Sequence, residues 1–551
     1  MALKKIRIKN FKSFEDFTLE FNAGLNILVG DNESGKSTVL EAVHLALTGM
    51  INGKYLNTEL TQYLFNNTVV ERYLASLETT SPEALPSIKI ELYFDKCDEI
   101  VEWMGSINED RDYDAYGLTF EILPNDPSGE YAELIKSSDS VKTLPIEYYD
   151  PKWTTFADKP LAAKSIPLKS ALVDSSLARY QNGSDIYVSR IVKQNLENTD
   201  KVKVAQAHRN MIERFADDPA IKAVNKEIQD SIVISDQEIS LSEEWLSKNT
   251  WENSLMTYIN KVPFHYIGKG EQCIIKTRLA LADKKARNAS IVLMEEPENH
   301  LTHAKLNQLL NVITSECAGR QVIVSTHSSF VANKLGIDNL ILLGKGGHQT
   351  RFANLSGIGT PEFFKKLPGY DTLRLVLSKG AILVEGASDE LVVQKAYTMA
   401  HEGKLPIFDG IDVISVGTSF LRFLKIASQL NKRIAVVIDN DGDIAALEAK
   451  YSDYLGMNAK ENIMISYDKN NHNPSEEVIE DYNYNTLENL MLISNGLNGM
   501  NAILDMECKT ERRMRLYMKN NKTDCALSIF EFSGNINFPE YIQEAINHVC
   551  Q

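Results

Sequence analysis

The feature that most constrains the fold is an octet at Gly30–Ser37, which reads Gly-Asp-Asn-Glu-Ser-Gly-Lys-Ser. The apolar run Leu25–Val29 precedes it, and the apolar spacing of Thr38–Val43 after it is typical of a helix. In such a strand, loop and helix unit, the glycines let backbone N–H groups turn towards phosphates, and the helix N-terminus adds its positive end. Because both flanking segments are present, the octet predicts a nucleotide site rather than an ordinary glycine-rich turn.

The octet also assigns roles to single residues. We expect Lys36 to reach the β- and γ-phosphates of ATP, and Ser37 to offer its hydroxyl to Mg²⁺. Asn32, Gly35 and Thr38 complete the predicted nucleotide contacts. The sequence therefore predicts ATP and Mg²⁺ as ligands of the N-terminal part of the chain.

The composition is typical of a soluble globular protein with several domains: 551 residues, of which 43% are hydrophobic and 24% charged. With a formal net charge of -17, binding to DNA would need a local basic surface, metal ions, or both. The six cysteines show neither a disulfide framework nor Cys-x-x-Cys spacing. Since the sequence has neither a signal-peptide core nor a run of about eighteen apolar residues, we expect a cytoplasmic protein that makes no membrane contact.

Two later strands are predicted to complete the ATP site. The apolar run that starts at Ser290 ends on Glu295 and Glu296, and the proline that follows is expected to hold Glu296 in an extended backbone. A second apolar strand, Gln321–Ser325, is followed by His327. We expect Glu295 to contact the cofactor, Glu296 to act in ATP hydrolysis and His327 to sense the γ-phosphate.

The opening Ile6–Phe14, followed by Asn26–Gly30, resembles the N-terminal half of ABC-type ATPase heads of the SMC and RecF kind. Gly268, Gly270 and Gln272 loosely resemble the Ser-Gly-Gly-Gln-type signature of such heads, which caps the γ-phosphate of the nucleotide bound to the partner subunit. A glycine-rich helix entry is the alternative interpretation. If the signature holds, the resemblance implies ATP between two heads, and therefore a homodimer or a higher homo-oligomer.

Three features depart from the ABC pattern. Glu295 stands where such ATPases usually have Asp, the signature matches loosely, and no clear glutamine loop lies between Ala42 and Phe120. These departures concern the rate of ATP turnover more than ATP binding.

Between Leu168 and Trp251 the apolar spacing becomes helical among many charges, which predicts an inserted arm. The arm is either a hairpin that packs on itself or a dimerisation arm.

Two further apolar strands end in carboxylates. The first, beginning at Gly380, ends on Glu385 with Asp389 just beyond, and the second ends on Asp439 and Asp441. Parallel βαβ connections would bring both ends together. Carboxylates this close repel one another unless divalent cations neutralise them, and oxygen ligands favour Mg²⁺ or Mn²⁺. Two such ions can clamp the attacking and leaving oxygens of a phosphodiester.

Capping of helix N-termini is the alternative interpretation of these carboxylates, above all for Asp443 and Glu390. The pattern Glu-Gly-x-x-Asp with Asp-x-Asp nevertheless closely resembles a Toprim domain. Tyr484–Leu490 adds another acidic residue, Glu488, and the chain ends with Lys-Thr-x-x-Ala-Leu from Lys522 and Pro-Glu-Tyr-Ile. Head, arm, Toprim pattern and ending together resemble the OLD (overcoming lysogenisation defect) family of nucleases over nearly the whole chain.

The OLD resemblance implies a two-metal site. Its metal ligands would be Glu385, Asp389, Asp439, Asp441 and Glu488, with Ser37 as the separate ligand of the ATP-bound ion. Lys522 would stabilise the transition-state phosphate, and Lys519 is the competing candidate. The basic residues near them belong either to a solvated helix face or to a surface that contacts the DNA backbone; they are Lys509, Arg512, Arg513, Arg515, Lys519 and Lys522.

The predicted fold class is α/β: an ABC-type ATPase head with an inserted helical dimerisation arm, followed by a Toprim, Rossmann-like nuclease domain. The predicted boundaries are 1–167 and 252–350 for the two parts of the ATPase, 168–251 for the arm, 351–378 for a linker and 379–551 for the Toprim domain.

The predicted function is an ATP-regulated, divalent-metal-dependent DNA endonuclease that serves in defence against bacteriophage. Because OLD proteins occur alone, in Gabija-type systems and with retrons, a helicase-like protein or a retron's reverse-transcribed DNA could accompany it. One alternative is an ATP-gated DNA-binding clamp or sensor of the SMC and RecF kind, without cleavage activity. A topoisomerase- or primase-like activity would need a further domain that the sequence does not supply.

Overall fold

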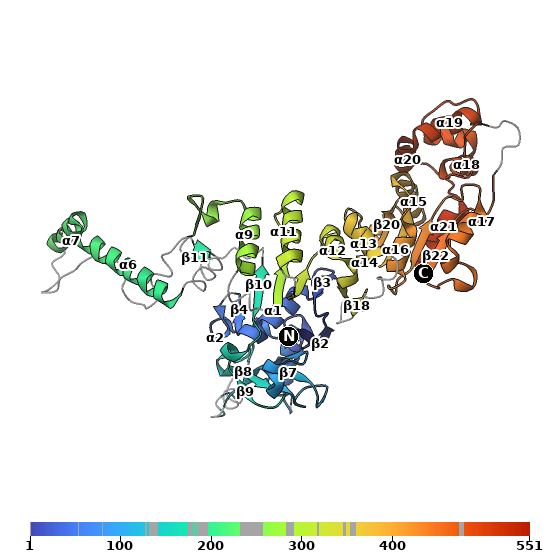
Figure 1. Cartoon of the computed structure of the whole chain (residues 1–551). Coiled ribbons are helices and arrows are strands. Elements are labelled where there is room, and N and C mark those ends of the chain that lie inside the picture. Colours follow the sequence, from blue (N-terminus) through green and yellow to red (C-terminus); the bar gives the residue numbers. More distant parts are fainter. Residues whose placement is uncertain are drawn as a thin grey trace. The chain divides into compact units, whose positions relative to one another are not determined.

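A computed structural model gives the structure of the chain (Figure 1). It describes residues 2–52, 54–79, 81–126, 129, 131, 141–174, 180–181, 184–185, 197–231, 257–282, 291–316, 319–344, 349–352, 360–472 and 479–551. The chain divides into two compact units. The first is Met1–Thr326 with Leu343–His348, and the second is His327–Leu342 with Gln349–Gln551.

An antiparallel sheet with the order β2-β1-β6-β7-β8-β9 forms one lobe of the first unit. In β1, Ile6 and Ile8 are fully buried, because alternate residues of a strand face the same side of the sheet. The strands of this sheet are β1 (Leu3–Phe11), β2 (Phe14–Glu20), β6 (Ile88–Phe94), β7 (Tyr116–Pro124), β8 (Tyr149–Thr155) and β9 (Pro160–Leu161).

A parallel sheet carries the phosphate loop. Within the first unit its strands have the order β10-β15-β16-β3, and all four positions Ile291–Met294 of β15 are buried, as expected for a strand covered on both faces. Glu295 is in register with Ser325, and Ser325 with Leu28, so the carboxyl ends of these strands share one edge. The bounds are β10 (Ser170–Asp174), β15 (Ile291–Glu295), β16 (Gln321–Ser325) and β3 (Leu25–Gly30), with α1 (Lys36–Thr48) starting at that edge.

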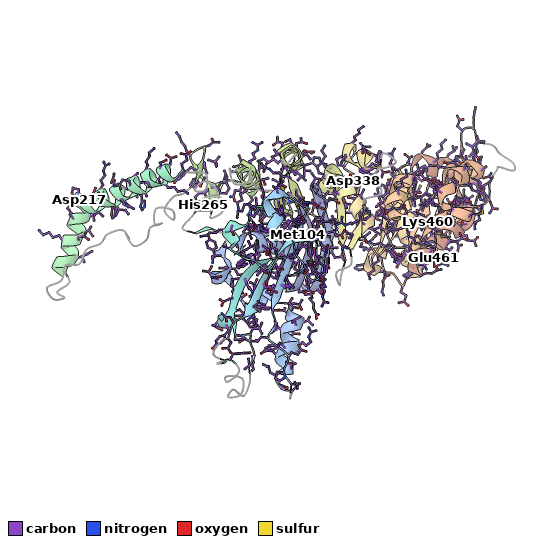
Figure 2. All side chains as sticks on the ribbon, turned by 60° about the horizontal axis from the view of Figure 1, so that its bottom comes forward. Met104, Asp217, His265, Asp338, Lys460 and Glu461 are labelled. Carbon is purple, nitrogen blue, oxygen red and sulfur yellow. The ribbon has the colours of Figure 1, made fainter. Side chains whose placement is uncertain are left out.

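The structure corrects the start of the predicted arm, 168–251. β10 lies in its first residues and pairs in parallel with β15, so this segment belongs to the ATPase sheet. The described part of the segment also contains two helices, α6 (Asn198–Asp217) and α7 (Pro219–Ser231), which contact each other. Most side chains of α6 are exposed, and Asp217 marks its end (Figure 2). Residues 175–179, 182–183, 186–196 and 232–251 of the predicted arm lie outside the described residues.

The second unit is built on a parallel sheet with the order β20-β19-β21-β22. β19 pairs with β20 on one side and β21 on the other, so the two strands predicted to end in carboxylates are direct neighbours. The strands are β19 (Gly380–Val384), β20 (Ile411–Ser415), β21 (Ile434–Val437) and β22 (Ile463–Ser466).

Helices surround this sheet with a continuous apolar core. α20 packs along α15, α18 contacts α19, and α21 contacts β21 and β22. Met491 of α18, Met514 of α19 and Ile542 of α21 are fully buried in this core. The helices are α15 (Ala387–Ala400), α16 (Phe420–Ala427), α17 (Ile444–Lys450), α18 (Leu487–Ile503), α19 (Glu511–Asn520), α20 (Lys522–Glu531) and α21 (Glu540–Cys550).

The structure also corrects the linker predicted at 351–378. Its described part contains α13 (Thr360–Lys366) and α14 (Thr372–Leu377), and both contact α12 (Ser329–Leu335). The buried Asn333 of α12 donates to the carbonyl oxygens of Pro368 and Tyr370. Because these hydrogen bonds fix the segment, it is a folded part of the second unit. Residues 353–359 lie outside the described residues.

The described residues contain further strands and α-helices. They are β4 (Met50–Ile51), β5 (Lys54–Tyr55), α2 (Leu56–Glu59), α3 (Asn67–Ser76), β11 (Tyr180–Gln181), β12 (Ser184–Asp185), β13 (Tyr258–Ile259), β14 (Val262–Pro263), α9 (Lys269–Ala282), α11 (His303–Glu316), β17 (Leu340–Leu343) and β18 (Gln349–Arg351). Across the described ranges, no helix has both the length and the apolar character that a membrane crossing requires.

Candidate nucleotide site and acidic site

Glycine is required at two positions of the phosphate loop. Gly35 has φ +91°, and a Cβ there would lie 2.2 Å from the ring of Phe14. A Cβ at Gly30 would lie 2.4 Å from the carbonyl oxygen of Leu343 and 2.6 Å from the hydroxyl of Ser34. The loop therefore depends on glycine for its backbone conformation and for its close packing.

Lys36 folds back over this loop. Its Nζ donates to the carbonyl oxygens of Gly30 and Asp31, each 2.9 Å away, and the residue is only 6% exposed. Burial lowers the pKa of Lys36, although the nearby charges of Glu296, Asp31 and Glu295 act against this shift. The ammonium group is thus already held where a phosphate could replace the two carbonyl acceptors.

Other predicted nucleotide contacts lie around the same edge. Ser37 donates to the carboxylate of Glu295, which brings together the hydroxyl at the start of α1 and the acid at the end of β15. The hydroxyl of Thr38 accepts from that of Ser13 at 3.1 Å, and Asn32 is exposed at the loop. The structure therefore assembles the predicted loop residues with Glu295, and their roles towards ATP stay predictions.

The proline after Glu296 led us to expect an extended backbone at Glu296, but the backbone there is not extended. Its φ is +39°, in the left-handed region that is unfavourable for a residue with a side chain. The Glu296 N–H donates to the Ser325 carbonyl at 3.0 Å, and its carboxylate accepts from the amide of Asn299 at 2.8 Å. A tight turn after β15 thus fixes the carboxylate.

His327, exposed two residues after β16, falls in the second unit, and its sensor role stays a prediction.

The signature-like segment is only partly arranged as the resemblance implies. Gly268 is open, whereas a Cβ at Gly270 would lie 2.5 Å from the carbonyl oxygen of His300. Gln272 is buried, and its amide donates to the Ile267 carbonyl at 2.8 Å. The Gln272 side chain therefore holds the entry to its own helix, and its predicted contact with a partner's nucleotide would require this bond to break.

In the second unit, the predicted acidic residues converge at the carboxyl edge of the sheet. Asp389, in the first turn of α15, accepts from the Gly386 N–H at 2.8 Å. Its pKa is raised to about 6, first by burial and then by the charges of Glu488 and Glu385, while the Gly386 bond and Lys522 oppose the shift. Burial and repulsion therefore destabilise the folded state when this carboxylate is ionised.

Asp439 lies at the centre of the same cluster. It accepts from the Leu487 N–H at 3.1 Å, at the start of α18. Burial, followed by the charges of Asp389, Glu488 and Asp441, raises the pKa of Asp439 well above its ordinary value. Such mutual repulsion is the electrostatic condition that a cation relieves.

Lys522 supplies a positive charge to this cluster. As the first residue of α20, it places its Nζ 2.9 Å from a carboxylate oxygen of Glu488. Burial lowers the pKa of Lys522, but the bond to Glu488 and the charges of Asp439 and Asp389 outweigh this and raise it. The competing Lys519 donates to the backbone carbonyl of Asp481 and is exposed. The geometry therefore favours Lys522 of the two lysines.

The sequence did not single out the amides that orient these carboxylates. The exposed Asp441, with φ +51°, accepts from the amide of Asn483 at 2.7 Å. The buried Asn440 donates to the carbonyls of Asp468 and Asn470, after β22. The asparagine-rich run before Glu488 was the available signal. The structure also assigns a capping role to Asp443, which accepts from the Ala446 N–H at 2.9 Å, in line with the capping interpretation.

The chemistry of the donors fits a hard divalent cation, because each is a carboxylate oxygen and burial and mutual repulsion destabilise the ionised form of Asp389 and Asp439. In the positions seen here, no three Asp, Glu, His or Cys side chains among the described residues form a ready coordination cluster. Each carboxylate with a resolved bond is turned towards an amide, a backbone N–H or Lys522. Cation binding would therefore require these side chains to exchange partners.

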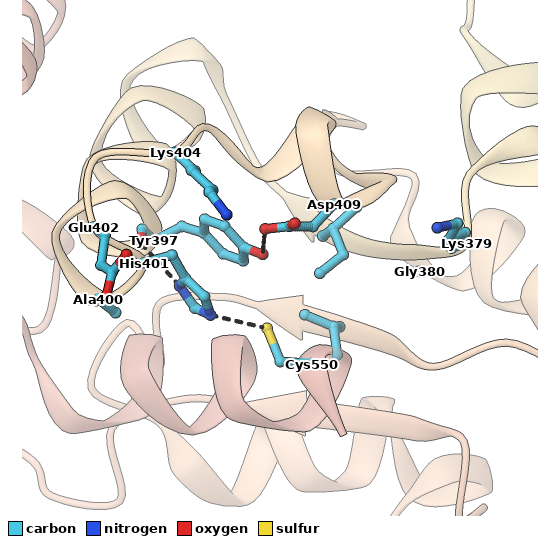
Figure 3. Close-up of a pocket in the computed structure, with 11 residues that line it drawn as sticks. Lys379, Gly380, Tyr397, Ala400, His401, Glu402, Lys404, Asp409 and Cys550 are labelled. Carbon is cyan, nitrogen blue, oxygen red and sulfur yellow. Dashed lines mark hydrogen bonds between the residues drawn. The ribbon is translucent and has the colours of Figure 1, made fainter.

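A separate hollow of about 550 Å³ opens at the opposite edge of this sheet, where β19 and β20 begin (Figure 3). His401 stacks on Tyr397 and lies 3.6 Å from the Cys550 sulfur, and Tyr397 donates to Asp409 at 2.7 Å. Burial raises the pKa of the Cys550 thiol, which keeps it protonated. These residues lie at the other end of the strands from the acidic cluster.

An ATPase head with a phosphate loop, joined to a Toprim domain with an acidic strand edge, is the class of protein that this fold and these sites define. A family model described as "AAA domain" matches residues 5–290, more than half of the chain, and a model described as "Overcoming lysogenization defect protein-like, TOPRIM domain" matches residues 376–441. The chain belongs to this AAA domain family and is an OLD-family fusion of an ATPase with a Toprim domain.

The matches to curated proteins are local. The DNA replication and repair protein RecF of Desulfitobacterium hafniense is 30% identical over 114 residues, which are 20% of this chain and 31% of that protein. The DNA double-strand break repair Rad50 ATPase of Archaeoglobus fulgidus is 46% identical over 50 residues, 9% of this chain and 6% of that protein. The chain thus matches less than a third of the length of either relative.

Among solved structures, an SMC head domain from Thermotoga maritima is 14% identical, covers 62% of this chain and 94% of that one, and has a TM-score of 0.29. A likeness at this level does not bear on the fold.

Proposed function

We propose that this protein is an ATP-regulated, divalent-metal-dependent DNA endonuclease. The observation that carries the proposal is the acidic edge of the second unit, where the charges of Asp389, Asp439 and Glu488 act on one another beside Lys522. Carboxylates that hold cations next to a lysine suit the cleavage of a phosphodiester, whose charge rises in the transition state. When bound, two Mg²⁺ or Mn²⁺ ions would supply a clamp for the attacking and leaving oxygens.

Different residues of the chain would bind the metal ions, the phosphate that is cut and the flanking DNA backbone. Asp389, Asp439, Glu385, Asp441 and Glu488 would hold the ions, which also removes their mutual repulsion. Lys522 would leave Glu488 for a non-bridging oxygen of the phosphate and neutralise its charge. The exposed basic side chains of the nearby helix, α19, would bind flanking phosphates without reading the sequence.

The first unit would regulate this site through ATP. Lys36, Ser37 and Glu295 are assembled at one sheet edge, as a nucleotide and its Mg²⁺ require. We propose that ATP joins two heads in a homodimer or higher oligomer, with the signature-like segment and the helical arm in contact with the partner. DNA as the substrate is supported by relatives described as DNA repair proteins. Action in the cytoplasm, in defence against bacteriophage and alongside a companion protein or nucleic acid, rests on the OLD resemblance.

The test is nicking of supercoiled plasmid DNA by the full chain with Mg²⁺ or Mn²⁺, with and without ATP. Asp439→Asn and Glu385→Ala should abolish nicking and leave ATP binding intact. Asp453→Asn, an exposed carboxylate of the same unit, is the matched control and should cut normally. Undiminished cleavage by a purified Glu385→Ala, Asp439→Asn double variant would refute the proposal.

A second candidate is an ATP-gated DNA clamp or sensor that does not cut. It is favoured by the bonds that engage two of the predicted ligands, since Glu488 pairs with Lys522 and Asp441 accepts from Asn483. ATP-dependent DNA binding, with no nicking of plasmid, linear or phage DNA in any nucleotide state or with either metal, would establish this function instead.

A further inference from the structure

A chain of hydrogen bonds leads from Asp441 to a histidine that the proposed cleavage does not use. The amide of Asn483 donates to Asp441 at 2.7 Å, and its oxygen accepts from the Asn485 N–H at 2.9 Å. The oxygen of Asn485 in turn accepts from the backbone N–H of His472 at 2.6 Å. The His472 ring is oriented by Asp468, whose carboxylate lies 2.8 Å from Nε2. His472 is therefore fixed relative to the acidic site.

The sheet places this pair at the same edge as Asp439. Asp468 follows β22, whose Ser466 is in register with Val437 of β21. Asn440, between the two acids of the Asp-x-Asp pattern, donates to the Asp468 carbonyl at 2.6 Å. The histidine and its carboxylate thus stand one strand away from the acidic cluster, and the backbone between them is hydrogen-bonded.

A hollow of about 250 Å³ opens beside His472. The loop after β22 forms one wall, α18 contributes Ile493 and Ser494, and the start of α21 contributes Tyr541 and Glu544. Its volume is below the roughly 300–1,000 Å³ of sites for drug-sized ligands, and it suits a single ring system. Tyr467 and Tyr541 also line it, and both are largely buried, so their rings form fixed walls.

The charges of this hollow exclude a phosphate as its occupant. Three carboxylates line it, from Asp468, Glu540 and Glu544, against Lys469 and the imidazole of His472. Lys469 lies 3.9 Å from Glu544, so its charge is largely matched. A nucleobase is neutral and carries N–H donors and ring acceptors on its edges, which match carboxylates and an oriented imidazole. The small exposed parts of Tyr467 and Tyr541 add apolar contact with a bound base.

We propose that this hollow is a nucleobase subsite, which receives one base of the DNA strand beside the phosphodiester that is cut. The inference deepens the proposed function and rests on it. His472 and Asp468 would read the edge of the base, and the hydrogen-bond chain to Asp441 would keep that base in register with the acidic site. The subsite gives the nuclease a preference for the base at one position next to the cut, and for DNA in which that base is unpaired.

Two variants of the full chain test the subsite. Ile493→Trp fills the hollow from a half-exposed position, and His472→Gln keeps a donor for Asp468 but removes the imidazole. Cut positions on plasmid DNA are mapped by sequencing the ends. Wild type should show a base preference at one flanking position, and both variants should flatten or change it while still requiring metal. KM should rise roughly five-fold or more, since losing the contacts of one bound base costs on the order of 1 kcal/mol or more.

His401→Gln is the matched control, because this histidine of the same unit lines the hollow at the opposite edge (Figure 3). It should leave the base preference unchanged. If both Ile493→Trp and His472→Gln keep the wild-type preference and KM, the base subsite is refuted, whereas the proposed nuclease function is not.

A binding measurement separates failure of the subsite from failure of the proposed nuclease function. With Ca²⁺ in place of Mg²⁺, anisotropy of a labelled single-stranded oligonucleotide is compared with that of versions carrying an abasic position. Wild type should lose roughly five-fold or more in affinity at one abasic position, and Ile493→Trp should lose none there. If wild type binds in this way but never cuts, the proposed function fails and the base subsite remains. If no abasic position weakens binding, the subsite is refuted.

Discussion

Replacing Asp389 by Asn should stabilise the second unit when no divalent metal is present. The carboxyl pKa of Asp389 rises from its ordinary 3.8 to about 6, first because the group is buried and then because Glu488 and Glu385 repel it. One pKa unit corresponds to about 1.4 kcal/mol, so the ionised form destabilises the folded state by about 3 kcal/mol near pH 8. Asparagine has the same shape without the charge, and its oxygen can still accept from the Gly386 N–H.

The sign of this effect follows from the direction of the shift. Because the pKa is higher in the folded state, the folded protein binds the proton more tightly, and the stability gained from that proton is lost as the pH rises through about 6. The advantage of Asp389→Asn should therefore be about 3 kcal/mol at pH 8 and about half of that at pH 5. For a unit of this size, 3 kcal/mol corresponds to a rise in Tm of roughly 6–12 °C.

Calorimetry of the full chain in a chelating buffer, at pH 8 and pH 5, measures this difference. Saturating Mg²⁺ should reverse the order, because it stabilises wild type and has a weaker effect on the variant. Asp453→Asn is the control and should shift Tm little at either pH, since its carboxylate is exposed. An Asp389→Asn protein with the wild-type Tm at pH 8 in chelator, or with an equal gain at both pH values, would refute the reasoning.

Three further outcomes are expected. Lys522→Ala should slow plasmid nicking by about 10²–10³-fold while Lys519→Ala stays within a few-fold, and equal losses would contradict the assignment. Glu296→Gln should keep the wild-type Kd for ATP, measured by calorimetry, and lose phosphate release, whereas rapid release would show that another group activates the water. Gly35→Ala should abolish ATP binding because φ is +91° and its Cβ would lie 2.2 Å from the Phe14 ring; a normal Kd would refute this packing argument.

The sequence was sufficient to predict the elements that depend on neighbouring residues alone. The octet at Gly30–Ser37 predicted a strand, a loop and a helix, and each is present because glycines, an apolar run and helical spacing act over neighbouring residues. The acids at the ends of β19 and β21 were also predicted to meet. That inference needed only the rule that parallel strands share an edge, which the register of Leu383 with Val436 confirms.

Long-range pairing was not available from the pattern. Ser170–Asp174 looked like the beginning of a helical arm, and only its pairing with β15 makes it a strand of the ATPase sheet. The segment predicted as a linker contains turn residues, but hydrogen bonds from the buried Asn333 fold it into the second unit. The extended backbone predicted for Glu296 failed for a similar reason, since the turn to Asn299 outweighs the local preference before proline.

The two sites hold their lysines in the same manner. Lys36 donates to two backbone carbonyls of its own loop, and Lys522 pairs with the carboxylate of Glu488. Each ammonium group therefore has oxygen partners before any ligand arrives, so a bound phosphate gains only the difference between its own contacts and those it replaces. For Lys522 the exchange requires that Glu488 find another positive partner, and under the proposed function a divalent cation would be that partner. Metal binding should accordingly precede productive engagement of the DNA phosphate by Lys522, so that adding Ca²⁺ should raise DNA affinity by a larger factor in the wild type than in Lys522→Ala, and an equal rise in both proteins would contradict this order.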